Sequence, residues 1–410
     1  MPSSAVRRDR FRWTILALIS ISHIIGASAQ YGINTLAPFY QDELRLSRAQ
    51  VGLFFSSFYL AMTAASFATG WLADRFGVRR TTLNGHLFVG ACIIAAASSP
   101  SFEWSCVSFF LAGCGYSFLN PASTIGVMTW FERAERATAM GIKQTGVPAG
   151  GVLAAMLAPS LVLIIGWRGA LGALGAINFL FGFVFFWLWR EPLNATSEQG
   201  AEPEVAVAGT PSLKVWQLLP ISCATAIYLV GQMALITYVP LYLKDVMSFS
   251  PYWASQALAL TQMGAMVGRI GWGMVSDRLF HGRRKIVLIW IGIFSALLIA
   301  ALGTLEPRSS PYVLLPILFT AGVSIVGYQG VSYALIAEIA GKARTGAGLG
   351  MMIAINSGAA TLGTPMFGYI VDRTGSYALA WQTLAVTVCI GIAGLALLLK
   401  EPKSNEVVNA

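Results

Sequence analysis

Apolar residues run in long blocks along this chain, and short polar breaks separate the blocks. Each block has about 20 residues or more, the length that an α-helix needs to cross a bilayer. A β-barrel would show alternation in segments of about 10 residues instead. The pattern predicts an all-α membrane protein with twelve transmembrane helices, at 12–38, 49–73, 81–99, 103–130, 136–163, 167–190, 214–243, 252–277, 285–305, 311–338, 344–371 and 378–400.

The longest polar segment falls after the sixth predicted helix. Residues 191–213 read EPLNATSEQGAEPEVAVAGTPSL, which is acidic and rich in turn-forming residues. Such a composition is typical of a linker. The expected organisation is an N-terminal six-helix bundle at 1–190, a cytoplasmic linker at 191–213 and a C-terminal six-helix bundle at 214–410.

Composition and charge support the membrane prediction. Hydrophobic residues make up 56% of the chain and charged residues 11%, against about 25% charged residues in soluble proteins. The net charge of +9 arises from Lys and Arg that concentrate in the loops on the side of both termini, as the positive-inside rule requires. We therefore expect a multi-pass protein of the cell (inner or plasma) membrane with both termini cytoplasmic, and no nucleic-acid partner.

A charged motif occurs once in each half. Residues 70–80, GWLADRFGVRR, follow the second predicted helix, and residues 273–285, GMVSDRLFHGRRK, follow the eighth. Internal duplication of this kind is expected of secondary transporters. Both segments resemble signatures of the major facilitator superfamily, and WFERAERATAMGI at 130–142 resembles the loop 4–5 segment of the same superfamily. The resemblance covers essentially the whole chain, and implies two bundles related by pseudo-twofold symmetry around a central cavity, with transport by alternating access.

The charges of the two motifs suggest a latch at the cytoplasmic helix ends. Ion pairs and helix dipoles there would hold the two halves together in one state and release them in the other. The alternative is that these charges only fix the topology. The predicted gating residues are Asp74, Arg75, Arg79, Asp277 and Arg278.

Three ionisable residues lie deep in predicted helices: His23, Lys143 and Arg269. Each is cationic or can become so, whereas all 18 acidic residues lie in tails, loops or near helix ends. A Lys or Arg near the centre of a membrane helix costs about 2.5–3.5 kcal/mol. An anionic substrate would compensate for that cost. For Lys143 the alternatives are snorkelling to the cytoplasm or pairing with Glu132 or Glu135.

A narrower resemblance concerns the substrate. Residues 30–60, QYGINTLAPFYQDELRLSRAQVGLFFSSFYL, and 268–273, GRIGWG, resemble the monocarboxylate and oxalate/formate-type branches of the superfamily. Those carriers use an arginine in helix 8 for the substrate carboxylate, and Arg269 matches it. Met351 stands at the counterpart of Lys143 in the eleventh helix, so the two halves do not carry a symmetric pair of cations.

Helical spacing places further polar residues on shared faces. His23, Gln30 and Asn34 share a face of the first helix. His23 is the proton-coupling candidate because its charge changes near neutral pH; it could instead only pack, and the proton could travel with the acid. The predicted substrate-binding residues are Arg269, Lys143, Tyr116, Asn120, Tyr228, Gln232, Tyr328 and Gln329. The alternative for each polar residue is a hydrogen bond between helices.

These features favour a monomeric secondary active transporter in the lipid bilayer. It would move a small organic anion, a monocarboxylate, with proton symport. Export of drugs by proton coupling is the alternative, disfavoured because cationic cargo usually needs a central carboxylate. A non-transporting membrane sensor ranks lower, and no metal cluster, cofactor loop or nucleophile–base set suggests an enzyme.

Overall fold

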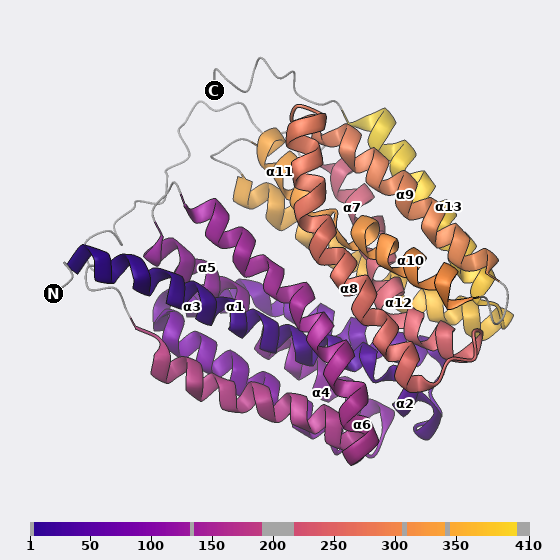
Figure 1. Ribbon diagram of the computed structural model, residues 1–410, viewed down its shortest axis with the longest axis horizontal. Helices are drawn as coiled ribbons and strands as arrows, with labels where there is room; N and C mark the ends of the chain where they lie inside the picture. Colours follow the sequence, from indigo (N-terminus) through magenta and orange to yellow (C-terminus); the bar gives the residue numbers. More distant parts are fainter. Residues whose placement is uncertain (1–3, 132–134, 191–216, 306–309, 341–344, 400–410) are drawn as a thin grey trace. The chain divides into compact units, whose positions relative to one another are not determined.

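The computed structural model describes residues 4–131, 135–190, 217–305, 310–340 and 345–399, and the elements in these ranges are helical (Figure 1). The helices are α1 (Ser4–Thr35), α2 (Ala37–Glu43), α3 (Arg48–Ala97), α4 (Phe102–Tyr116), α5 (Leu119–Trp130), α6 (Arg136–Leu188), α7 (Leu219–Asp245), α8 (Pro251–Met274), α9 (Arg284–Thr304), α10 (Pro311–Ala321), α11 (Gln329–Ala340), α12 (Thr345–Thr374) and α13 (Tyr377–Leu398). Two short π-helices, η2 (Val275–Leu279) and η3 (Gly322–Val326), extend α8 and follow α10.

Two of the helices are too long to be single spans. α3 has 50 residues and α6 has 53, whereas about 20 residues cross a bilayer. Each is interrupted by one glycine with positive φ, Gly77 at 75° in α3 and Gly166 at 69° in α6. A residue with a Cβ rarely adopts that conformation. Each of these helices therefore holds two of the predicted spans, joined without a loop.

The described helices correspond to the twelve predicted spans. Fewer of them are long and apolar enough to be identified as membrane spans by length and hydropathy alone. Six described helices meet such criteria, and α3 adds a seventh as a bent pair. The fourth predicted span is divided into α4 and α5 around Ser117 and Phe118. The tenth contains α10, η3 and α11 in succession.

The helices form two compact units. Unit 1 contains Met1–Leu46, Leu53–Gly200 and Pro251–Ala259; unit 2 contains Ser47–Gly52, Ala201–Ser250 and Leu260–Ala410. The expected linker, 191–213, lies outside the described residues. The beginnings of α3 and α8 are assigned to a different unit from the rest of each helix. Ser47–Gly52 belongs to unit 2, whereas α3 from Leu53 belongs to unit 1. Pro251–Ala259 belongs to unit 1, whereas the rest of α8 belongs to unit 2.

Unit 1 contains an extensive contact between α1 and α6. Its core near the end of α6 includes Ile15, Ile19, Phe131, Phe185 and Trp189. The Phe185 and Trp189 rings stack with centroids 5.4 Å apart. This packing fixes α6, which carries Lys143, against α1, which carries His23.

Unit 2 has α7 at its centre. The side chains of α7 are buried along most of its length, and the helix packs chiefly against α12 and α13. α13 also packs on α9. A helix that is apolar all round and buried on most sides is typical of a bundle interior.

Candidate functional site

Lys143 projects from α6 toward α5 and is 1% exposed. Its Nζ donates to Thr124 Oγ1 at 2.8 Å, to Asn120 Oδ1 at 3.0 Å and to the Asn120 carbonyl oxygen at 3.4 Å. An ammonium group has three N–H donors, so all three are used. The three acceptors are neutral, which leaves the positive charge of Lys143 hydrogen-bonded but not neutralised by them.

The alternative partner that the sequence offered to Lys143 is engaged elsewhere. The Glu135 carboxylate accepts two hydrogen bonds from Arg12, at 2.6 Å from Nη1 and 3.1 Å from Nη2. Such a bidentate pair is the strong form of the interaction. Glu132 lies outside the described residues. The Lys143 ammonium is directed into unit 1 and does not reach for Glu135.

Asn120 separates the Lys143 charge from the exposed side of α5. The Asn120 side chain is exposed whereas Lys143 beneath it is buried. Because Lys143 takes the amide oxygen, the amide nitrogen of Asn120 is the group that can donate to a ligand. Hydrogen bonds in a chain polarise one another, so this amide is a suitable donor to an anion.

His23 of α1 contacts the same turn of α5 that binds Lys143. Its Nε2 lies 2.8 Å from Ser123 Oγ, and the Ser123 hydroxyl donates to the Asn120 carbonyl at 2.8 Å. This arrangement assigns the ring proton to Nε2, since the serine hydrogen is already used. Nδ1 is buried with no hydrogen-bond partner. His23 and Lys143 thus both connect to the Asn120 carbonyl, and an unoccupied acceptor nitrogen remains on the histidine.

Close packing of α1 and α6 brings these groups together. A Cβ added at Gly146 would lie 2.9 Å from His23 Cβ, and one at Gly150 would lie 2.4 Å from the Ile24 carbonyl oxygen. The helices can approach this closely only because both positions are glycine. The small-residue spacing in the fifth predicted helix thus has the packing role that such motifs indicate.

A second buried histidine belongs to unit 1, and the sequence interpretation missed it. His86 in α3 is fully buried; Nε2 lies 2.7 Å from Ser22 Oγ, and Nδ1 lies 3.1 Å from Asn178 Oδ1. The Asn178 amide nitrogen donates to the Ile25 and Leu174 carbonyls. This network holds the α1 segment next to His23. The signal was available, since His86 stands inside an apolar block.

The other predicted residues of unit 1 are buried around the same face. Tyr116 is 7% exposed, and its ring lies 5.6 Å from that of Phe58. Asn34 is fully buried, and neither polar atom of its side chain has a hydrogen-bond partner. A buried unsatisfied amide costs free energy, so Asn34 is suited to a bound water or ligand.

In unit 2, Arg269 is placed by a backbone contact between α8 and η3. A Cβ added at Gly268 would lie 2.1 Å from the Val323 carbonyl oxygen, and Trp272 Nε1 donates to that oxygen at 2.8 Å. Arg269 is half-buried and lies within electrostatic reach of the Tyr333 hydroxyl. π-helices such as η3 often occur at functional sites.

The remaining residues predicted for unit 2 contact one another. The rings of Tyr228 and Tyr328 meet edge to face at 5.5 Å, and Gln329 Nε2 donates to Gln232 Oε1 at 3.4 Å. The Tyr228 hydroxyl donates to the Leu288 carbonyl at 3.0 Å. Tyr228 therefore anchors α7 to α9, whereas the Gln232–Gln329 pair retains further donors and acceptors.

The predicted gating charges make local contacts. Arg79 donates from Nε to the Phe186 carbonyl at 2.7 Å, and its guanidinium lies 3.9 Å from the Phe186 ring centroid. Arg75 lies over the Trp71 ring, and Asp277 is 3.6 Å from Arg284. Asp74 and Arg278 are exposed. The proposed cytoplasmic latch remains a prediction.

Comparisons with known proteins place the chain in a family. The profile of the Major Facilitator Superfamily matches residues 19–331 and 272–410. The chain belongs to the major facilitator superfamily. This confirms the all-α membrane fold inferred from the sequence, and the relatives described below are transporters and not enzymes. It is accordingly a multi-pass membrane protein.

Three known proteins are similar to this chain over most of its length. A probable sulfoacetate transporter, SauU, of Cupriavidus necator is 25% identical, over 97% of this chain and 95% of the relative. Monocarboxylate transporter 13 of Bos taurus is 23% identical, over 83% of each chain. A crystal structure of a bacterial homologue of the human lysosomal transporter Spinster has a TM-score of 0.75, with 17% identity over 94% of this chain and 96% of the other. The last comparison supports the fold alone.

Proposed function

We propose that this protein is a secondary carrier that moves a small organic anion, a monocarboxylate, together with a proton by alternating access. The observation that carries the proposal is the Lys143 ammonium, which is buried and, among the described residues, hydrogen-bonded to the neutral oxygens of Asn120 and Thr124. A cation in the membrane normally pairs with an anion. Here the anion would be the cargo, held through the Asn120 amide.

Arg269 supplies the second cation. A guanidinium is always charged and can bind a carboxylate with two parallel hydrogen bonds. The position next to η3 fixes the backbone of Arg269 while the side chain stays half-buried. The names of the two relatives, which refer to sulfoacetate and to monocarboxylates, agree with an anionic substrate.

Proton coupling is assigned to His23. Its Nδ1 is a buried acceptor without a partner, and its Nε2 connects through Ser123 to the Asn120 carbonyl that Lys143 also contacts. A proton on Nδ1 would add positive charge beside Lys143 and so favour anion binding. Loss of the anion would favour release of the proton, which is the linkage that symport requires.

Uptake into proteoliposomes tests the function directly. Labelled short-chain monocarboxylates, dicarboxylates and cationic drugs would be compared with and without an inward proton gradient. We expect uptake of monocarboxylates, stimulated by the gradient. Uptake of the cationic drugs with none of the acids would overturn the proposal in favour of drug export, and specific acid binding without uptake would favour a sensor.

Arg269→Lys is the matched variant for the substrate carboxylate. Lysine keeps the charge but loses the bidentate geometry, so we expect uptake to fall about tenfold or more, the effect of losing a hydrogen bond to a charged group. Arg283→Lys is the control, because Arg283 is an exposed residue outside the candidate site. Equal uptake by the two variants would remove Arg269 from the site.

A further inference from the structure

A buried polar network in unit 1 joins α1 to α3 and to the second half of α6, next to His23. His86 of α3 and Asn178 of α6 are fully buried, and Ser22 of α1 is 3% exposed. All of these residues lie in unit 1. Polar side chains that are buried this deeply need defined hydrogen-bond partners, so the position of each proton in the network can be deduced.

The orientation of the Asn178 amide is fixed by two carbonyl groups. Its Nδ2 donates to the Ile25 carbonyl at 3.0 Å and to the Leu174 carbonyl at 3.1 Å. A carbonyl oxygen only accepts, so the atom next to both carbonyls must be the amide nitrogen. The amide oxygen, Oδ1, therefore faces His86 Nδ1 at 3.1 Å and can only accept.

His86 must carry its ring proton on Nδ1. Asn178 Oδ1 needs a donor, which makes Nδ1 the N–H nitrogen and leaves Nε2 as the acceptor of the neutral ring. Ser22 Oγ lies 2.7 Å from Nε2, so the serine hydroxyl donates to the histidine. His86 thus has the opposite tautomer to His23, whose contact with Ser123 places the proton on Nε2.

Close packing of α3 on the second half of α6 holds the His86 ring in this orientation. The ring meets the Phe181 ring edge to face, with centroids 5.1 Å apart. A Cβ added at Gly90 would lie 2.6 Å from the Phe179 backbone nitrogen, and one added at Gly182 would lie 3.1 Å from His86 Cβ. The two helices therefore leave the ring little room to turn toward another partner.

The network holds α1 at two points that flank His23, the Ser22 hydroxyl and the Ile25 carbonyl. Successive side chains on a helix are about 100° apart around its axis. Fixing Ser22 therefore also fixes the direction in which His23 leaves the helix. That direction brings His23 Nε2 to 2.8 Å from Ser123 Oγ of α5.

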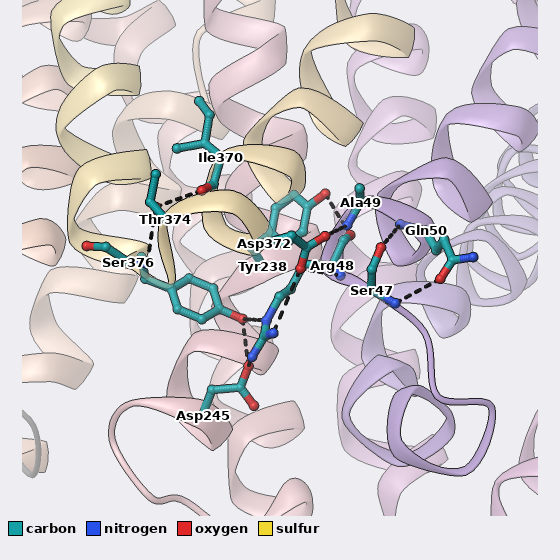
Figure 2. A network of polar contacts seen from close by, with 11 residues as sticks. Ser47, Arg48, Ala49, Gln50, Tyr238, Asp245, Ile370, Asp372, Thr374 and Ser376 are labelled. Atoms are coloured by element: carbon teal, nitrogen blue, oxygen red, sulfur yellow. Dashed lines mark hydrogen bonds and ion pairs between the residues drawn. The ribbon is translucent and has the colours of Figure 1, made fainter.

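Burial and neutrality distinguish this network from the polar contacts drawn in Figure 2. There the Tyr377 hydroxyl donates to the Asp245 carboxylate at 2.8 Å, and the Asp245 side chain is 16% exposed. Water can reach that carboxylate and compete for its hydrogen bonds. His86, Ser22 and Asn178 are neutral in the arrangement deduced above and are closed to water, so their geometry is the more rigid.

We propose that His86 is a positioning residue. Through Ser22 and Asn178 it fixes the rotation of α1, which keeps the His23 proton on Nε2 and leaves Nδ1, without a hydrogen-bond partner among the described residues, open to a second proton. His86 acts through α1 and does not take up the proton itself, because both of its ring nitrogens are already used. The inference rests on the proposed function in one step, the assignment of proton coupling to His23.

Nitrogen NMR of histidine-labelled protein in nanodiscs tests the proton positions without cargo. The chain has three histidines, His23, His86 and His281, so His23→Gln and His281→Gln assign the signals. At a pH at which imidazole is neutral, we expect the proton on Nδ1 in His86 and on Nε2 in His23. A proton on Nε2 of His86 would overturn the proposal, because Asn178 Oδ1 would then have no donor.

Two substitutions separate the hydrogen bonds of His86 from its bulk. Glutamine can donate to Asn178 and accept from Ser22, whereas leucine can do neither. We expect His86→Leu to lose the single Nε2 tautomer of His23, together with the stimulation of uptake by a pH gradient, while exchange of labelled for unlabelled anion continues. His86→Gln should keep both the tautomer and the stimulation.

Thr69→Val is the matched control in α3. Thr69 is 2% exposed and donates to the Ser117 carbonyl at 3.1 Å. Valine keeps the shape of the side chain and removes this buried hydrogen bond, which does not involve α1. The His23 signals should not change. A change as large as that in His86→Leu would mean that any buried hydrogen bond lost from α3 disturbs α1, and would overturn a specific role for His86.

Two further outcomes would overturn the positioning role. An unchanged His23 tautomer in His86→Leu means that the network does not direct the His23 ring. Loss of that tautomer in a folded His86→Gln variant means that these hydrogen bonds are not what directs it. If His86→Leu does not fold, the glutamine variant and the tautomers of the unmodified protein still decide. Failure of anion uptake by the unmodified protein, with the expected NMR signals, would reject the proposed function and leave the positioning of His23 in place.

Discussion

At the scale of single residues, the charge of Lys143 is the feature with the largest expected effect. Three neutral oxygens hold the ammonium, and a buried cation in a membrane helix costs about 2.5–3.5 kcal/mol. We predict that Lys143→Met loses most anion uptake while the melting temperature stays equal or rises. Lys244→Met, at the end of α7, is the control. A large loss of stability in Lys143→Met would instead make Lys143 a structural residue.

Asn120 tests whether a fixed carboxylate can replace the cargo. Asn120→Asp places a negative charge about 3 Å from Lys143, as its Oδ1 already lies at 3.0 Å. We predict an internal ion pair and a strong fall in uptake, because the substrate must then compete with a tethered anion. Asn120→Ser keeps a neutral polar group and should retain more uptake. Greater loss in the serine variant would contradict the electrostatic explanation.

His23 is tested by separating coupling from translocation. His23→Gln keeps a hydrogen-bonding group toward Ser123 but removes the site that could take a proton. We predict that exchange of labelled for unlabelled anion persists, whereas stimulation of net uptake by a pH gradient is lost. The comparison uses the same proteoliposomes for both assays. Full stimulation in the variant would assign the proton to the substrate acid.

At the scale of helices, the contact of α1 with α6 depends on small residues. A Cβ at Gly150 would lie 2.4 Å from a backbone oxygen of α1, whereas one at Gly141 meets nothing within 4 Å. We predict that Gly150→Ala destabilises the protein by about 1–3 kcal/mol, as overpacking does, and that Gly141→Ala does not. Thermal unfolding in detergent measures both. Equal stability of the two variants would show that α1 and α6 can separate at no cost.

Helix boundaries were predicted well where a polar break is long, and less well where it is short. The ends of α7 and α9 fall close to the predicted limits. The breaks at Gly77 and Gly166 were read as loops, yet helix continues on both sides of each glycine. A single positive φ redirects a helix without needing a polar segment, so hydropathy gives no sign of how the turn is made.

At the scale of the whole molecule, the distribution of Lys and Arg predicts the orientation. Twelve spans place both termini on one side, and the positive-inside rule places that side in the cytoplasm. We predict that a small epitope at either terminus is protected in intact cells and becomes accessible after permeabilisation. A tag in the segment between α1 and α3 should show the reverse. One terminus accessible from outside would mean an odd number of spans.

The sequence alone determined the fold class and the family, because burial in lipid restricts a chain to apolar helices. It also made each deep charge conspicuous. It could not determine which groups meet. The direct contacts of Lys143 and of His86 join residues between 19 and 92 positions apart. Helix packing sets those contacts, because the rotation and the depth of each helix decide which side chains face one another. The hydropathy pattern contains little information about either.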